Sequence, residues 1–480
     1  MLFNSLPYAI FLPIVFIAYW VLPHKYRWLF LLLASYWFYM SWNAGYVLLI
    51  LFTTVISYSM AIALEKEENS DRKKAILIIS ALLCLSVLFF FKYYAFVGNS
   101  VIDLLGRFSI RLDPITRWLI LPVGISFYTF QTLGYVIDVY KGKVPAEHHF
   151  GYYAAFVSFF PQLVAGPIER TNSLLPQIKE RHYFDYEQAT YGLKLMAWGY
   201  YKKLVIADAL SSYVSRIYDS PQKYAGFSLV LATILFSIQI YCDFSGYSDI
   251  AIGTAKLFGI TLTTNFRSPY FSDCIKEFWR RWHISLSTWF RDYVYIPLGG
   301  NHRGRLRNAG NLLITFLVSG LWHGANWTFV VWGGIHGVLQ ILEEALVPDV
   351  KRKDTGRVVM LVRMFIVFAL VTFAWIFFVS HSIGDAFYVI AHMGEGVTSP
   401  VSYIYNGIID IGISASDLIK VCFTVLILAV YDYLSLNKDV IECISRWNVF
   451  LRWAIYVAFT LVLVFFSHKG VAAEFVYFQF

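Results

Sequence analysis

Two histidines in apolar surroundings are the residues of this sequence whose type and setting best suit chemistry. His323 lies in GLWHGANW, between an apolar run too short to cross a membrane and a full span. Backbone that breaks at membrane depth is tolerated only where protein or a water-filled cavity surrounds it, and Gly320, Gly324 and Asn326 mark such a break. Because imidazole exchanges protons near neutral pH, we predict that His323 is a general base. The alternative is a buried histidine with a structural role.

The second candidate, His283, lies in a basic and aromatic segment. Residues 272–309 have the composition of a helix at the cytoplasmic headgroup level, with Phe278, Trp279, Trp282, Trp289 and Phe290 interleaved with Lys276, Arg280, Arg281 and Arg291. A helix that only lies on the lipid surface is the simpler interpretation of this cytoplasmic interfacial segment. It does not explain why His283 is followed by the turn-forming PLGGN and a second basic cluster.

Polar side chains interrupt two further apolar stretches. SIQIYCDFSGYSDIAIG (237–253) carries Gln239, Asp243, Ser245 and Asp249, and FYTFQTLGYVIDVY (127–140) carries Gln131 and Asp138. An ionisable residue inside a span is costly and usually faces a bundle interior or a wet cavity. Both stretches are therefore predicted to be inner-wall helices. The alternative for Asp243 is that it only holds a neighbouring helix by a hydrogen bond.

The composition requires lipid around these residues. Hydrophobic residues make up 58% of the 480 residues and charged residues 15%, against roughly 45–50% apolar and 25% charged in soluble domains. The net charge of +8 fits Lys- and Arg-rich cytoplasmic loops. The sequence contains no basic soluble segment of the kind that binds nucleic acid. The five cysteines occur singly, without the spacing of a disulfide framework or a zinc site. We expect an all-α polytopic membrane protein without a bound metal or cofactor.

Apolar runs of about 20 residues, the length that crosses a bilayer, predict about eleven transmembrane helices. They lie near residues 6–22, 27–42, 46–64, 76–97, 118–137, 191–217, 227–258, 325–347, 358–379, 415–435 and 451–467. The first is expected to be a retained span, because no basic leader or small-residue cleavage site accompanies it. The runs 150–165 and 310–322 are too short or too broken for ordinary crossings, so we expect re-entrant segments and a site there.

Loop charges predict the orientation, because Lys and Arg concentrate in short cytoplasmic loops. Basic loops occur at 65–74, 276–307, 351–357 and 438–446, whereas 380–414 contains no Lys or Arg. The last span then places the tail 468–480 on the outer side. Arg107, Arg111 and Arg117 fall in a loop that this scheme also puts outside, so the charges do not fix the topology of residues 98–190. Without an internal repeat, residues 1–480 are predicted to form one membrane domain.

Three segments together resemble a known family. WRRWHISLSTWFRDYVYIPLGGN with His283, LWHGANWTFVVWGGIHG with His323, 40 positions later (323 minus 283), and YCDFSGYSDIAIG are similar to segments of the bacterial membrane-bound O-acyltransferases. The resemblance covers essentially the whole chain, from LFNSLPYAIFLPI to EFVYFQF. It is strongest to the branch that O-acetylates alginate and peptidoglycan, with the teichoic acid D-alanyl branch as a sister.

The resemblance implies a ring of tilted helices around a central funnel in the bacterial cytoplasmic membrane. His323 would lie at the constriction and His283 nearer the cytoplasm, and the polar residues of the funnel wall would be Gln239, Asp243, Ser245 and Asn326. As catalytic base, His323 would deprotonate an acceptor hydroxyl that attacks a cytoplasmic thioester, either acetyl-CoA or an acyl carrier protein thioester. His283, Arg280 and Arg281 would hold the anionic part of this donor.

The tail adds a further inference from the resemblance. Related systems end in a short aromatic motif whose tyrosine is proposed to relay the acyl group, and EFVYFQF places Tyr477 in such a motif. The partner would be a separate extracytoplasmic O-acetyltransferase of the SGNH type that acts on a cell-envelope polysaccharide. An aromatic anchor at the membrane interface is the alternative for the tail. D-alanyl transfer, or transport of a lipid or glycan, is the alternative for the chain.

Overall fold

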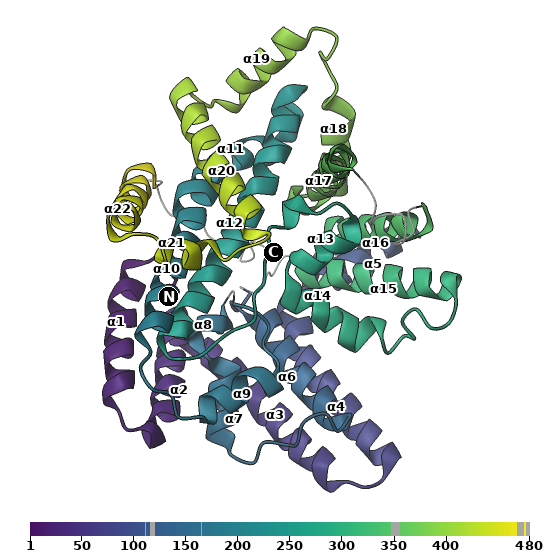
Figure 1. The fold of residues 1–480 in the computed structure, drawn as a ribbon. Helices are drawn as coiled ribbons and strands as arrows, with labels where there is room; N and C mark the ends of the chain where they lie inside the picture. The colour runs from purple at the N-terminus through teal and green to yellow at the C-terminus, as the bar shows by residue number, and fades with distance from the viewer. Residues whose placement is uncertain (111, 116–120, 165, 347–355, 468–474, 477–480) are drawn as a thin grey trace. The chain divides into compact units, whose positions relative to one another are not determined.

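The computed structural model describes the chain except residues 111, 116–120, 165, 347–355, 468–474 and 477–480, and in that part the regular elements are all helices (Figure 1). The all-α class is therefore confirmed for the described residues. The chain forms two compact units. The first comprises Met1–Met196 and Ala251–Thr263, and the second comprises Ala197–Ile250 and Thr264–Phe480. One membrane domain over residues 1–480 stays a prediction.

The first unit is built from helices of the N-terminal part of the chain. They are α1 (Leu6–Val21), α2 (His24–Met40), α3 (Val47–Lys66), α4 (Ser70–Leu88), α5 (Tyr94–Gly106), α6 (Ile125–Tyr140), α7 (Phe150–Ser158), α8 (Phe160–Leu163), α9 (Thr171–Lys179) and most of α10 (Tyr186–Tyr200). α3 packs against α4, α6 and α7. α7 and α8 occupy the predicted re-entrant segment; they are separated at Phe159 and mostly buried, as broken backbone in an apolar environment must be.

The second unit contains the remaining helices and both candidate histidines. Its elements are the π-helical turn η3 (Tyr201–Ala207), α11 (Asp208–Tyr218), most of α12 (Phe227–Leu257), α13 (Ile275–Arg281), α14 (Ile284–Phe290), the π-helical turn η6 (Arg291–Tyr295), α15 (Arg305–His323), α16 (Trp327–Leu346), α17 (Arg357–Val379), α18 (Ile383–His392), α19 (Pro400–Ile411), α20 (Ala415–Ser435), α21 (Val440–Ser445) and α22 (Val449–Phe466). Aromatic residues of α12, α13, α16 and α17 form a buried core that includes Phe236, Phe278, Trp332 and Trp375.

Within the described ranges, seven helices are long and apolar enough to cross a membrane, and each coincides with a predicted span. They are Ala44–Lys66, Ser70–Gly106, Phe227–Leu257, Trp327–Leu346, Arg357–Val379, Ala415–Ser435 and Val449–Phe466. The other predicted spans fall on shorter or interrupted helices: α1 and α2 have 16 and 17 residues, α6 begins only at Ile125, and the run 191–217 contains the π-helical turn. The predicted bounds 6–22 and 27–42 agree with α1 and α2 to within three residues, and the count of about eleven spans stays a prediction.

α15 and α16 pack backbone against backbone. A Cβ atom added at Gly320 would overlap the carbonyl oxygen of Phe329, and one at Gly333 would overlap that of Phe316. Small residues permit this close approach of membrane helices. The crossing fixes the end of α15, whose last residue is His323.

Replacing Gly333 by alanine should destabilise the protein by about 1–3 kcal/mol, because the added methyl group forces the two backbones apart. Gly334→Ala is the matched control, since its Cβ would meet only Leu317 Cδ2 at 3.5 Å, an ordinary contact, and alanine is favoured over glycine in a helix. Thermal unfolding in detergent measures the stability of both variants. Equal unfolding midpoints for the two variants would contradict the backbone packing.

Candidate active site

His283 lies in a tight turn between two short helices. α13 ends at Arg281 and α14 begins at Ile284, so His283 is the residue that precedes α14. Its φ is 43°, in the left-handed region that few residues other than glycine adopt, and its side chain is fully buried. A strained backbone of this kind persists only where surrounding contacts hold it.

Asn265 supplies these contacts. Its backbone oxygen accepts a hydrogen bond from Ile284 N at 3.0 Å, and its Oδ1 accepts from Ser285 N at 3.2 Å and Ser285 Oγ at 2.8 Å. Its Nδ2 donates to Ser248 Oγ on α12 at 3.2 Å. The sequence analysis did not identify Asn265, because an asparagine in a loop carries no local sign of a partner 20 residues away.

His323 is buried beside His283. Aromatic rings enclose its imidazole, with centroid distances of 5.0 Å to Trp322, 4.9 Å to Trp332 and 5.5 Å to Phe378. The ring centroids of His283 and His323 are 6.4 Å apart. The structure thus brings together the two histidines that the sequence indicated, while their catalytic roles stay predictions.

The aromatic residues around His283 face protein. Phe278, Trp279, Trp282, Trp289 and Phe290 are all buried, although the segment 272–309 has the composition of a lipid-surface helix. Trp282 and Phe278 stack with centroids 5.5 Å apart. A helix that only lies on the lipid surface therefore does not describe this part of the segment. Composition could not distinguish the two cases, because it does not report which neighbour covers a side chain.

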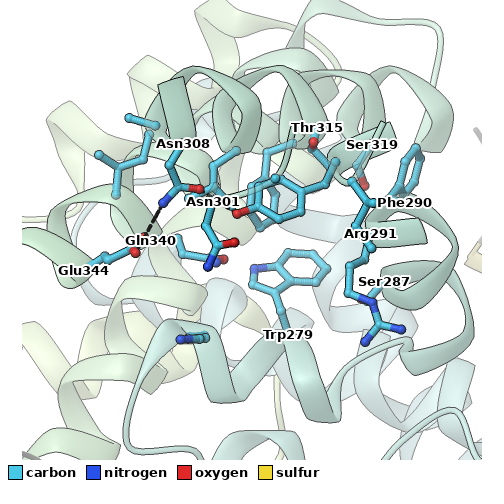
Figure 2. Close-up of a pocket in the computed structure, with 18 of the residues that line it drawn as sticks. Trp279, Ser287, Phe290, Arg291, Asn301, Asn308, Thr315, Ser319, Gln340 and Glu344 are labelled. Carbon is cyan, nitrogen blue, oxygen red and sulfur yellow. Dashed lines mark hydrogen bonds between the residues drawn. The ribbon is translucent and has the colours of Figure 1, made fainter. Parts of the chain in front are cut away.

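A cavity of about 1170 Å³ lies in the second unit (Figure 2). α13, α14, η6, α15 and α16 contribute to its lining. Trp279, Phe290 and Phe316 supply aromatic surface, and the charged lining residues are Lys276, Arg280, Arg291, Arg305, Glu343 and Glu344. Cations therefore outnumber carboxylates among the described residues of the lining. The cavity suits an anionic ligand that also has an apolar part.

Both carboxylates of the cavity are engaged within the protein. Glu343 accepts hydrogen bonds from Ile275 N at 2.9 Å and Lys276 N at 3.1 Å, so it caps the N-terminus of α13. Glu344 accepts from Asn308 Nδ2, a contact drawn in Figure 2. These bonds offset part of their negative charge, which favours binding of an anion by the cavity's arginines.

The two arginines predicted to bind a donor have different surroundings. Arg280 lines the cavity, its side chain is 65% exposed, and its NH1 lies 3.7 Å from a Glu277 oxygen. The lining of this cavity does not include Arg281, whose Nε donates to Glu277 at 2.8 Å and whose side chain is 25% exposed. Arg280 thus lines the cavity, whereas Arg281 forms the shorter ion pair within α13, and donor binding by either arginine stays a prediction.

Trp279 lies between the cavity and the histidines. Its ring borders the cavity (Figure 2) and packs against Trp332 with centroids 5.8 Å apart. Trp332 in turn lies 4.9 Å from His323. Ser319, one turn before His323 on α15, also lines the cavity. By this route, two aromatic rings separate the cavity from the imidazole of His323.

A third buried histidine, His336 on α16, was not identified from the sequence. The rings of Trp279 and Trp332 each lie 5.0 Å from its ring, and Phe278 stacks on it at 6.2 Å. Within the described part of the chain, neither ring nitrogen has a hydrogen-bond partner. The signal that could have found it is an ionisable side chain inside the predicted span 325–347.

The residues predicted to line a funnel have different environments. Gln239 and Ser245 are buried within α12, and Asp243, on the same helix, forms a buried ion pair with a lysine of η3. Asn326 caps the N-terminus of α16 and donates to the backbone oxygen of His381 at 2.9 Å. These contacts account for Asp243 and Asn326 structurally, and the funnel-lining role of all four residues stays a prediction.

Both histidines fall in the part of the chain that matches a known family. The profile of the MBOAT, or membrane-bound O-acyltransferase, family matches residues 143–383. This chain therefore belongs to the membrane-bound O-acyltransferase family. It is an O-acyltransferase and a multi-pass membrane protein.

Known relatives come from more than one branch of the family. The probable alginate O-acetylase AlgI of Pseudomonas aeruginosa is 39% identical, over 77% of this chain and 70% of its own. The peptidoglycan O-acetyltransferase of Helicobacter pylori is 35% identical, over 82% of this chain and 80% of its own. The teichoic acid D-alanyltransferase of Streptococcus thermophilus is 29% identical, over 55% of this chain and 67% of its own. The resemblance noted in the sequence is confirmed.

Protonation of His283 should oppose folding at acid pH. Burial lowers the pKa of His283 from 6.5 to about 3, so the folded chain keeps the imidazole neutral, whereas the unfolded chain binds a proton as the pH falls through 6.5. This contribution to stability is full above the unfolded pKa and is lost as the pH falls toward 3. From pH 7 to 5 the loss should be about 2 kcal/mol.

The matched variant for this prediction is His283→Asn, because asparagine tolerates the left-handed backbone and does not titrate. The free energy of unfolding in mixed detergent should fall more steeply for the wild type than for the variant between pH 7 and 5. Parallel curves would show that His283 is protonated in the folded protein as readily as in the unfolded chain.

Proposed function

We propose that this O-acyltransferase moves an acetyl group from a cytoplasmic thioester across the bacterial cytoplasmic membrane toward a cell-envelope polysaccharide. The observation that carries the proposal is the pair of buried histidines, 6.4 Å apart, near a cationic cavity. The relatives named for O-acetylation are 39% and 35% identical, and the one named for D-alanyl transfer is 29% identical. D-alanyl transfer for teichoic acid is therefore the second candidate. Transport of a lipid or glycan has no support from the relatives' names.

In the proposed reaction His323 is the general base. It takes the proton of an acceptor hydroxyl while the oxygen attacks the thioester carbonyl carbon. The carbon–sulfur bond then breaks, and the leaving thiolate receives the proton from His323, which returns to its neutral form. His283, neutral at pH 7 because burial lowers its pKa, can hydrogen-bond the donor. The surrounding aromatic rings exclude water, which would otherwise hydrolyse the thioester.

The cavity is the proposed donor site. Coenzyme A and acyl carrier proteins share a phosphopantetheine arm, which joins a phosphate to a long neutral chain that ends in the thioester. Arginine binds phosphate through two parallel hydrogen bonds, and Arg280 and Arg291 line this cavity together with Trp279. Its volume of about 1170 Å³ is slightly larger than the roughly 300–1,000 Å³ of small-molecule pockets. Either acetyl-CoA or an acyl carrier thioester is thus a suitable donor.

Tyr477, which lies outside the described residues, is the proposed acyl relay. His323 would remove its phenolic proton, since a neutral phenol of pKa about 10 is a poor nucleophile, and the resulting aryl ester would pass the acetyl group on. The partner would be an extracytoplasmic SGNH-type O-acetyltransferase that acylates the polysaccharide. The support is that Phe475 and Val476, directly before Tyr477, are buried in the second unit.

His323→Ala should abolish acyl transfer, with a loss on the order of 10²- to 10⁴-fold, because the general base is removed. The measurement is mass spectrometry of the purified protein after incubation with labelled acetyl-CoA or acetyl carrier protein. Wild type should carry the label on the peptide with Tyr477, and His323→Ala and Tyr477→Phe should not. Near-normal labelling of the alanine variant would mean that His323 is structural. An unlabelled wild type together with full glycan acetylation by Tyr477→Phe would eliminate the relay.

Arg280→Gln should raise the apparent KM for the donor by roughly 10- to 100-fold, the effect of one charge-assisted hydrogen bond, with little change in kcat. Arg281→Gln is the matched control, because the Arg281 side chain pairs with Glu277 and does not line the cavity. It should change thermal stability and leave the donor KM near wild type. Equal KM values for wild type and both variants would remove the cavity as the donor site.

A further inference from the structure

The segment Phe475–Val476, called here the docked segment, is buried in the second unit. Phe475 is fully buried and Val476 is 4% exposed. The ring of Phe475 lies 4.5 Å from that of Tyr247 and 5.7 Å from that of Phe244, both on α12. The charge pattern predicted that the tail is on the outer side of the membrane.

One charge-assisted hydrogen bond holds the docked segment. The backbone N–H of Val476 donates to Oδ2 of Asp243 at 2.8 Å. Asp243 is only 2% exposed, so water does not compete for this carboxylate. Bonds of an N–H to an ionised, buried acceptor are stronger than those between neutral groups. Asp243 therefore has a specific partner in the main chain of the docked segment.

A buried lysine holds the Asp243 side chain in place. Lys203 Nζ lies 2.7 Å from Oδ1 of Asp243 and 2.8 Å from Oδ1 of Asp208, and these three side chains are at most 2% exposed. Lys203 belongs to the π-helical turn η3, a form of backbone that occurs frequently at functional sites. One cation thus faces two carboxylates, and Asp243 accepts the Val476 N–H with its second oxygen.

The docked segment lies close to the histidine pair. The ring of Phe244 touches both Phe475, at 5.7 Å, and His283, at 4.5 Å. His283 is in turn 6.4 Å from His323. A single ring therefore separates the docked segment from His283.

We propose that Asp243, oriented by Lys203, is the positioning residue that docks the segment Phe475–Val476 beside the histidines. The inference rests on the proposed function, in which the next residue, Tyr477, receives the acyl group. Asp243 recognises the main chain, and the rings of Phe244 and Tyr247 recognise the Phe475 side chain. The docking is non-covalent, so the segment can be released after Tyr477 has been acylated.

Amide hydrogen exchange measures the docking directly, without any acyl donor. In the full-length protein, Asp243→Asn should lower the exchange protection of the peptide that contains residues 475–477 by roughly 10- to 100-fold, the effect of one charge-assisted hydrogen bond. Asp249→Asn is the matched control. Asp249 is on the same helix as Asp243 and forms an ion pair at 2.7 Å with Lys202, the residue next to Lys203 in the sequence. This control variant should leave protection of this peptide at the wild-type level. Full protection in Asp243→Asn would overturn the proposal.

A second pair of variants leaves the buried charges intact. Val476→Pro removes the N–H donor, whereas Val476→Ala keeps it. Val476→Pro should reduce labelling of Tyr477 by roughly 10-fold or more, and Val476→Ala should not. Wild-type labelling in the proline variant would also overturn the docking role. Loss of protection in Asp243→Asn without any labelling of wild-type Tyr477 would support docking and reject the relay, so the two hypotheses fail separately.

Discussion

Burying a polar group away from water costs several kcal/mol unless the group gains a hydrogen-bond or ion-pair partner. The second unit is organised around this cost. Asn265 uses its backbone oxygen, Oδ1 and Nδ2 to hold the turn at His283 and to reach α12. Lys203 bridges two carboxylates in a setting from which water is excluded. Removing one partner of such a group leaves an uncompensated polar atom, so these contacts restrict the structure more strongly than the surrounding apolar packing does.

The apolar packing has a different task, which is to place the histidine pair. Gly320 and Gly333 let α15 and α16 approach closely, which sets the position of His323 at the end of α15. The left-handed turn aims His283 into the same space. Trp332 and Phe378 then surround the imidazole of His323. Rigid positioning of this kind is what general-base catalysis needs, since the base must lie within hydrogen-bond reach of the proton that it removes.

Two aromatic routes lead to the histidine pair from different parts of the second unit. From the cavity, Trp279 and Trp332 lead to His323. From the docked segment, Phe244 leads to His283. Separate approaches for donor and acceptor would let the acyl group cross at the histidines without exposing the thioester to water. This arrangement agrees with the names of the relatives, which are a probable alginate O-acetylase, a peptidoglycan O-acetyltransferase and a teichoic acid D-alanyltransferase.

Local patterns in the sequence were sufficient for the membrane class, for seven of the spans and for the two histidine motifs. Hydropathy and motif spacing are properties of neighbouring residues, so no tertiary structure was needed to find them. The ends of helices such as α6, the burial of the aromatic residues around His283, and the difference between Arg280 and Arg281 depended on which elements pack together. Asn265 and the contact of Val476 with Asp243 join residues distant in sequence. Only the folded chain determines such contacts, because the sequence around each residue does not indicate which distant segment will pack against it.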